Sequence, residues 1–407
     1  MAESRKRSSE VYVGITISFF SAFITLIFVD QVVFRYLNTL SKPIESVDMV
    51  PGAERLTFNT YHPILGYNGV PNISKKFTDS VVTHNSLGNR GRDLDCAVSN
   101  HVAPIVVSGD SQAWGYGVGD EETIPASLER QELAHTGRDV PVLNFGTSGY
   151  GPDQSLLKYL LYGRICKPRL VIFILFAGND FDEVVGTTAW GAEKPRMIIH
   201  HGNLCLTNIP PRRAKGWPYG DARTRLLDTL PWLDKSVALG GYSFRFRDSQ
   251  ILEFLSRREF LSSWGDSHQE IQRIVGGDLI ADSFPCFKET VTPADITEQS
   301  GVVLVSEILE HFKRIVEADG GQFRVLIVPP MNESHDKNLA APRQAIREIL
   351  RRQETRFTDL GDSEGIPEEL ALKDEPWAWT YASHLSARAS DIAAKRVLSD
   401  AIRDGQL

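Results

Sequence analysis

From residue 102 onward, short runs rich in apolar residues alternate with segments in which apolar residues recur at helical spacing. The runs Ile105–Val107, Val140–Asn144 and Leu170–Ala177 are typical of buried strands. Helices are expected between them, over Ile124–Leu133 and from Asp153, whose side chain is suited to cap the second helix. The run at 170–177 is apolar throughout, which indicates a central parallel strand covered on both faces.

The same alternation returns towards the C-terminus. Strands are expected over Phe323–Val328 and Arg356–Asp359, and Gly320-Gly321 ends the helix before the first of them. The apolar positions that mark helical faces are Val305, Ile308, Leu309, Phe312, Ile315 and Val316, then Ile346, Ile349 and Leu350, and finally Ala389, Ile392, Ala393 and Val397. This alternation predicts a three-layer α/β/α fold with a mostly parallel sheet and right-handed crossovers.

The pattern near the N-terminus is different. Val11–Val29 is an uncharged apolar run that follows the basic cluster Arg5-Lys6-Arg7. A helix of that length, at about 1.5 Å per residue, spans roughly 30 Å of hydrocarbon. The cations predict a cytoplasmic N-terminus, with the rest of the chain outside the cytoplasm. A cleaved signal peptide is the alternative, but no small-x-small site follows the run, so we prefer an uncleaved transmembrane anchor.

Three parts are expected along the chain. Residues 1–35 form the basic tip and anchor, residues 36–101 a tether and a small β-rich ornament, and residues 102–404 the α/β domain. Glycines punctuate short extended pieces between residues 66 and 91, which favours hairpins over an independent domain. Residues 181–300 interrupt the strand–helix alternation and are a candidate lid. Their aromatic residues, which serve either as a substrate wall or as the insertion's own small core, are Trp190, Trp217, Tyr219, Trp232 and Trp264.

Composition narrows the classes of function. A formal net charge of −8 argues against a basic surface for binding phosphates, so we expect no nucleic-acid partner. The cysteines contain no Cys-x-x-Cys pair, which argues against a metal cluster. Either Cys205 pairs with Cys286 in an oxidising compartment, or the thiols are free and buried. The other cysteines are Cys96 and Cys166, and the histidines expected to be structural or exposed are His62, His84, His200 and His201.

A candidate nucleophile follows the first strand of the α/β domain. Ser108-Gly-Asp-Ser111 reads as a tight turn that places the Ser111 hydroxyl at the carboxyl edge of the sheet, where open α/β sheets bind their ligands. A serine on such a turn becomes a nucleophile when a base and oxyanion donors lie nearby. Gly-Asp-Ser is also ordinary turn chemistry, so its meaning depends on the partners.

Three further short motifs lie where those partners are needed. Gly149 follows the second strand, and no side chain blocks its N–H from an oxyanion. Asn179 follows the central strand and offers a neutral amide donor for the same oxygen. His384 precedes the last helix, from which it can reach Ser111 as a general base.

These four blocks, in this order, resemble the SGNH (GDSL-type) hydrolase superfamily over residues 102–180 and 301–400. The resemblance implies that Ser111 is the nucleophile, that its N–H, Gly149 and Asn179 form the oxyanion hole, and that His384 is the base. It implies no metal or organic cofactor. Two further segments look like those of membrane-anchored bacterial members, and they are Asn85-Ser-Leu-Gly88 and Asn203-Leu-Cys-Leu-Thr-Asn-Ile-Pro210.

One position departs from the family's pattern. The family usually places an Asp three, sometimes two, residues before the His, and Tyr381 and Ala382 occupy those positions here. Asp374, Glu375 or a backbone carbonyl is then left to orient the imidazole, or the site works as a Ser-His dyad.

The resulting hypothesis is an extracytoplasmic serine esterase that hydrolyses an acyl ester, acetyl esters included, on a cell-envelope glycan or lipid. One alternative is an O-acyltransferase that uses the same residues to modify a surface polysaccharide. Another is an inactive glycan-binding or assembly protein, which the missing Asp motivates. The sequence predicts no oligomeric state.

Overall fold

The computed structural model divides the chain into two units, residues 1–53 with 215–267 and residues 54–214 with 268–407. It describes residues 58–62, 64–77, 79–93, 96, 102–189, 192–209, 211, 283–284, 300–333, 337–362, 372, 378–380 and 383–407, together with 21, 25, 236–239 and 242–245.

In the first unit, the described residues include one antiparallel hairpin, β12 (Ser236–Leu239) with β13 (Tyr242–Arg245). Ser21 and Thr25 are helical, and the Thr25 hydroxyl donates to the Ser21 carbonyl at 2.8 Å. The rest of the predicted anchor, Val11–Val29, lies outside the described residues. Among the residues that the structure does describe, no helix has the length and apolar character needed to span a bilayer.

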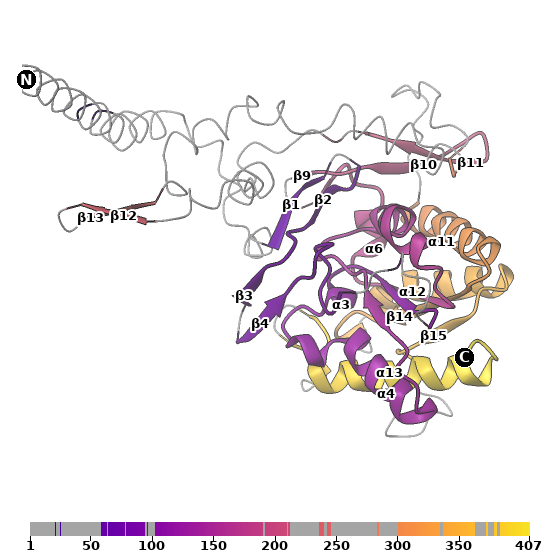
Figure 1. The fold of residues 1–407 in the computed structure, drawn as a ribbon. Coiled ribbons are helices and arrows are strands. Elements are labelled where there is room, and N and C mark those ends of the chain that lie inside the picture. The colour runs from indigo at the N-terminus through magenta and orange to yellow at the C-terminus, as the bar shows by residue number, and fades with distance from the viewer. Residues whose placement is uncertain are drawn as a thin grey trace, which may run out of the picture. The chain divides into compact units, whose positions relative to one another are not determined.

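A parallel sheet is the centre of the second unit (Figure 1), as the sequence predicted. Its strand order is β15-β14-β7-β5-β6, and every pairing is parallel. The central strand β7 is buried along its whole length, because neighbouring strands and helices cover both its edges and its faces. The strands are β5 (Ile105–Gly109), β6 (Val142–Asn144), β7 (Leu170–Phe176), β14 (Gln322–Val328) and β15 (Phe357–Asp359).

Helices cover both faces of this sheet, so the predicted three layers are present (Figure 1). Successive side chains of β7 point to opposite faces. Ile172 joins a core cluster with apolar residues of α4 (Ile124–Thr136) and α13 (Ala387–Arg403). Phe173 instead contacts Phe312 of α11 (Gly301–Ala318), with ring centroids 6.2 Å apart. Helices α5 (Pro152–Lys158) and α12 (Lys337–Arg352) pack beside α11.

Shorter elements connect these layers. Within the described residues, the predicted insertion begins in the short helix α6 and continues with two antiparallel hairpins, β8–β9 and β10–β11. The aromatic residues named for the insertion lie outside the described residues. The short elements are α3 (Ser111–Trp114), η3 (Asp120–Glu122), the π-helix η4 (Tyr159–Gly163), η5 (Arg164–Cys166), α6 (Asp180–Glu183), β8 (Thr188–Ala189), β9 (Ala192–Glu193), β10 (Arg196–His200) and β11 (Asn203–Thr207).

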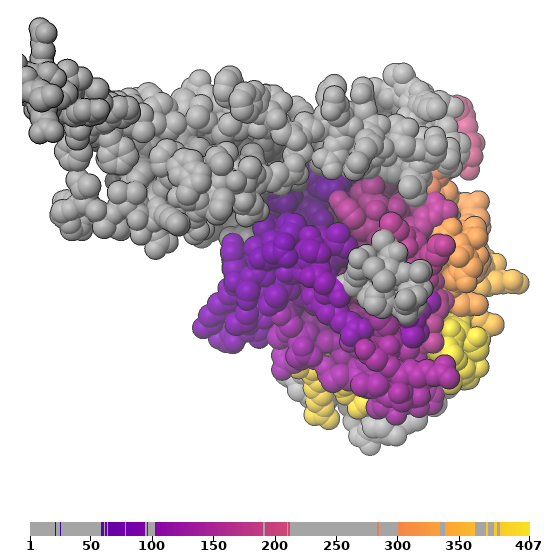
Figure 2. All heavy atoms as spheres, viewed as in Figure 1, coloured from indigo at the N-terminus to yellow at the C-terminus, as the bar shows by residue number. Residues whose placement is uncertain are grey.

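The region expected to be β-rich forms two hairpins that pack onto the sheet unit. In the space-filling view their surface is continuous with that of the sheet unit (Figure 2). Arg90, which follows them, is 1% exposed and donates to the carbonyls of Trp114, Gly115 and Val118. The hairpins are therefore built into the domain that follows them. They are β1 (Asn59–His62) with β2 (Gly66–Gly69), and β3 (Ser74–Phe77) with β4 (Ser80–Thr83).

The prediction that Asp153 caps α5 is wrong. Gly151, in extended conformation, is the N-cap, and Pro152 occupies the first turn, where its fixed φ and missing N–H are tolerated. Asp153 lies inside the helix instead and pairs with Lys194 at 2.5 Å, with both side chains fully buried. Burial raises the pKa of the Asp153 carboxyl, and the Lys194 ammonium opposes that rise.

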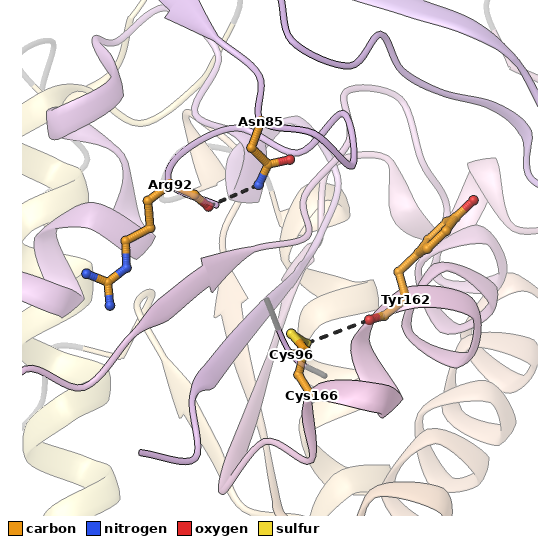
Figure 3. The surroundings of a disulfide bond; sticks show 5 residues. All are labelled: Asn85, Arg92, Cys96, Tyr162 and Cys166. Carbon is orange, nitrogen blue, oxygen red and sulfur yellow. Dashed lines mark hydrogen bonds between the residues drawn. A yellow bond between two sulfur atoms is a disulfide. The ribbon is translucent and has the colours of Figure 1, made fainter. Parts of the chain in front are cut away.

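The described cysteines form disulfides rather than free thiols, and one of the pairs was not predicted from the sequence. Cys96 is bonded to Cys166, with Cα atoms 4.6 Å apart, beside Tyr162 (Figure 3). The two cysteines precede β5 and β7, and because these strands are neighbours, the segments leading into them meet. Cys205 is also disulfide-bonded, so free thiols are excluded for the described cysteines. The partner expected for it, Cys286, lies outside the described residues.

Removing the described disulfide should lower stability without altering the sheet. The Cys96–Cys166 bond closes a loop of 70 residues. A loop of that size restricts the unfolded chain and typically contributes about 2–4 kcal/mol. We expect the combined variant Cys96→Ser with Cys166→Ser to unfold at lower urea concentration, with the midpoint read from far-ultraviolet circular dichroism. A midpoint equal to that of the wild type would contradict a stabilising role for this bond.

Candidate active site

The candidate nucleophile lies on a sharp turn at the carboxyl end of β5. Gly109 has φ of +148°, and a Cβ there would lie 2.7 Å from the Ile174 carbonyl oxygen of β7, so only glycine fits. Asp110 then caps α3 by accepting from the Gln112 N–H at 2.8 Å. Ser111 is thereby the first residue of α3, where its N–H has no partner within the helix.

The structure brings Ser111 and His384 together. Ser111 Oγ lies 2.7 Å from His384 Nε2, and the two residues are 2% and 5% exposed. Ser111 Oγ is also 3.4 Å from Asp110 Oδ2, and because the hydroxyl has one proton, it donates to only one of these two groups at a time. When the hydroxyl donates to His384, Nε2 is unprotonated and the imidazole proton is on Nδ1, which is the tautomer that a general base requires.

The main chain of His384 and the face of its ring are both held in place. The His384 carbonyl accepts from the Thr380 N–H at 2.6 Å and from the Thr380 hydroxyl at 3.1 Å. The ring of Tyr116 lies against the imidazole, with centroids 4.4 Å apart and planes 31° from parallel. Asp374 and Glu375, the carboxylates considered as orienting groups, lie outside the described residues, as do Tyr381 and Ala382.

Gly149 belongs to a buried loop after β6 that is fixed at several points. Its φ is +79°, and the Thr147 N–H earlier in the loop donates to the Gly109 carbonyl at 3.1 Å. The Tyr67 hydroxyl of β2 donates to the Ser148 carbonyl at 3.2 Å. Hydrogen bonds therefore connect the loop that holds Gly149 both to the turn that precedes Ser111 and to the N-terminal hairpins.

A buried lysine supports the same loop. Lys158 of α5 is fully buried and donates to the Thr147 hydroxyl at 2.7 Å. Its Nζ also lies over the rings of Phe145 and Tyr150, 5.9 and 5.7 Å from their centroids. Burial lowers the pKa of Lys158 to about 7. Near neutral pH this side chain is therefore able to lose its charge while it remains in contact with the loop.

Asn179 lies beside Asp110. Its amide nitrogen donates to Glu183 Oε1 at 3.0 Å and to Asp110 Oδ2 at 3.4 Å. Asn179 and Ser111 therefore both contact the carboxylate of Asp110, which connects them. To bind an oxyanion, the amide would exchange its longer contact with Asp110 for the new oxygen.

Two acids near Asn179 have raised pKa values. Burial raises the pKa of Glu183 to about 8, with a further contribution from the negative charge of Asp110. Burial also raises the pKa of Asp180 well above its usual range, and Asp110 and Glu183 add to that effect. Near neutral pH, Glu183 is therefore mostly protonated and holds the Asn179 amide without placing a full negative charge next to it.

The segment after Ser111 is braced by the N-terminal hairpins. Trp114 donates from its indole N–H to His84 Nε2 at 3.3 Å, and His84 Nδ1 is 3.1 Å from the Val70 carbonyl. Burial lowers the pKa of His84 to about 4, so the ring is neutral and structural, as the sequence predicted. The Arg90 guanidinium stacks on the Trp114 ring, 5.1 Å from its centroid.

The sequence predicted Ser111 and His384, which the structure places in contact, but it missed most of the residues that surround them. The missed residues are Gln112, Tyr116, Lys158 and Glu183. The Trp-Gly-Tyr-Gly run after Ser111 was the one available signal, because aromatic residues between glycines indicate a packed loop. Within the described residues, no group of three or more His, Cys, Asp or Glu side chains is arranged to hold a metal ion.

Comparisons with known proteins return distant structural similarities. No family model and no curated protein matches the chain. The chain is similar to TesA (12% identity, TM-score 0.34, covering 75% of this chain and 99% of the other). It is similar to a protein of Desulfitobacterium hafniense DCB-2 assigned to the lipolytic G-D-S-L family (11%, 0.31, 74% and 99%). It is also similar to the lipase Lip_vut3 from a goat rumen metagenome (12%, 0.33, 74% and 97%). At these identities and TM-scores, none of the similarities bears on what the chain does.

The raised pKa of Glu183 predicts how stability depends on pH. Between about pH 4.5 and 8 the unfolded chain releases this proton and the folded chain keeps it, so the free energy of unfolding falls as pH rises through that window. The variant Glu183→Gln removes this contribution and should show a shallower fall than wild type, measured by urea unfolding at a series of pH values.

Asp182→Asn, at an exposed position of the same short helix, is the matched control. A profile for Glu183→Gln that parallels the wild-type profile from pH 4.5 to 8 would show that Glu183 is not protonated in the folded chain.

Proposed function

We propose that the chain is a serine hydrolase that cleaves acyl esters through an acyl-enzyme intermediate. The observation that carries this proposal is the buried hydrogen bond of 2.7 Å between Ser111 Oγ and His384 Nε2. A nucleophile and a base within 2.6–3.2 Å of each other are the core of this chemistry. The same contact favours a working site over the inactive alternative, because it needs two loops 273 residues apart to be kept in register.

In the first step, Ser111 Oγ attacks the ester carbonyl carbon as its proton passes to His384 Nε2. A tetrahedral intermediate forms, with its negative charge on the former carbonyl oxygen. The C–O bond to the alcohol then breaks, and the alcohol leaves with the proton from His384. The acyl group remains as an ester of Ser111. Water, activated by the same imidazole, releases the acid and restores both residues.

The oxyanion would be held by the Ser111 N–H, the Gly149 N–H and the Asn179 amide. Three features support this role. The Ser111 N–H has no partner within α3, the loop of Gly149 is bonded to the nucleophile turn through Thr147, and Asn179 already contacts Asp110 beside Ser111. Donors that are fixed before the reaction stabilise developing charge most effectively, because they need no reorganisation.

An extracytoplasmic location is part of the proposal. The disulfide between Cys96 and Cys166 supports it, because such bonds persist in oxidising compartments. The apolar run Val11–Val29 behind a basic cluster supports membrane anchoring with this domain outside the cytoplasm. The substrate that we propose is therefore an acyl ester on a cell-envelope glycan or lipid.

Removing the nucleophile should abolish ester cleavage. We expect Ser111→Ala to lower kcat/KM for a short-chain nitrophenyl ester by about 10⁴-fold or more, as in other serine hydrolases that lose the attacking oxygen. The measurement is nitrophenolate release by the purified full-length chain.

Ser306→Ala is the matched control, because it removes a buried hydroxyl that donates only to the Val303 carbonyl of its own helix. Equal turnover by Ser111→Ala and wild type would contradict the proposed function.

A further inference from the structure

The side chain of Gln112 holds the main chain on both sides of His384. Its amide nitrogen donates to the Ser383 carbonyl and its amide oxygen accepts from the Leu385 N–H, each at 3.1 Å. Gln112 is 3% exposed, so water does not compete strongly for these bonds. One planar group therefore contacts the residues immediately before and after the candidate base.

Gln112 is also the residue next to the candidate nucleophile. Its own N–H donates to Asp110 Oδ1 at 2.8 Å, which fixes it at the start of α3. The amide consequently joins the turn that carries Ser111 to the turn that carries His384. The distance between Ser111 Oγ and His384 Nε2 depends on the relative position of these two turns, and Gln112 bonds to both, through its N–H and its side-chain amide.

The chemistry of the amide suits this position. An amide donates and accepts from the same planar group, whereas an ionised carboxylate only accepts and an ammonium only donates. The main chain around His384 presents one acceptor and one donor, the Ser383 carbonyl and the Leu385 N–H. Ser383 has φ of +62°, an uncommon conformation for a residue with a side chain, so the turn needs such bonds to keep its shape.

We propose that Gln112 is a positioning residue that keeps the His384 turn in register with Ser111 for proton transfer. The inference rests on the proposed function, because it assigns Gln112 a role through those two residues. Gln112 touches neither residue's reacting atoms in this role. Thr380 and Tyr116 hold the carbonyl and the ring face of His384, and Gln112 connects that assembly to the nucleophile turn.

The test compares variants of two glutamines. Gln112→Met keeps the length of the side chain and removes both bonds. Gln131→Met is the matched control, because the Gln131 amide bonds to the carbonyl and carboxylate of Asp391 on α13 and joins helices rather than the two turns. We expect Gln112→Met to lower kcat for a nitrophenyl ester by about 10- to 100-fold with KM changed by less than about twofold, as misplacement of a reacting group does. Gln131→Met should retain the wild-type kcat.

A second variant separates positioning from general stability. In Gln112→Glu the introduced carboxyl accepts from the Leu385 N–H in either state but donates to the Ser383 carbonyl only when protonated. Its kcat relative to that of wild type, measured at each pH, should therefore rise as pH is lowered. The ratio removes the part of the pH dependence that both proteins have in common.

Wild-type kcat in a folded Gln112→Met variant, or an equal loss of kcat in Gln131→Met, would overturn the inference. If Gln112→Met does not fold, a pH-independent ratio for Gln112→Glu overturns it instead. Ser111→Ala, assayed on the same substrate, reports separately on the proposed function, since full activity in that variant contradicts the serine mechanism and not the role of Gln112 alone.

Discussion

The hydrogen bond between Ser111 and His384 joins turns that are 273 residues apart, and the candidate site depends on keeping them in contact. The parallel sheet supplies the frame, because β5 delivers Ser111 to its carboxyl edge and α13 begins just after His384. Gly109 allows the close approach to β7 that makes the turn sharp. The sheet alone does not fix the distance of 2.7 Å between Ser111 Oγ and His384 Nε2. The side chains around the two turns hold these residues in position.

Much of this support comes from outside the α/β domain as the sequence delimits it. Arg90 bonds to carbonyls of the segment after Ser111, and Tyr67 bonds to the loop of Gly149. The N-terminal hairpins are thus part of the site's structure, since they hold the segments that carry the proposed oxyanion donors. Around Asn179, burial keeps Glu183 protonated near neutral pH, which limits negative charge where an oxyanion would form.

The fold was predictable because its signals are local. Apolar runs and helical spacing mark the strands and helices, and the serine, glycine, asparagine and histidine blocks each follow a strand or precede a helix. The supporting residues were not predictable in the same way. Gln112 and Lys158 act through partners that only the tertiary structure brings near, and the Cys96–Cys166 pairing follows from β5 and β7 being neighbours. The prediction that Asp153 caps α5 was wrong because Pro152 occupies the first turn and Gly151 is the N-cap.

The most direct test of the account is covalent labelling with a fluorophosphonate, followed by digestion and mass spectrometry of the full-length chain. An activated serine loses its proton to the base as its oxygen bonds to phosphorus and fluoride leaves. The account predicts modification of Ser111, and much slower modification of the same serine in His384→Gln. A folded chain that remains unlabelled at Ser111, or that is labelled equally fast without His384, would contradict it.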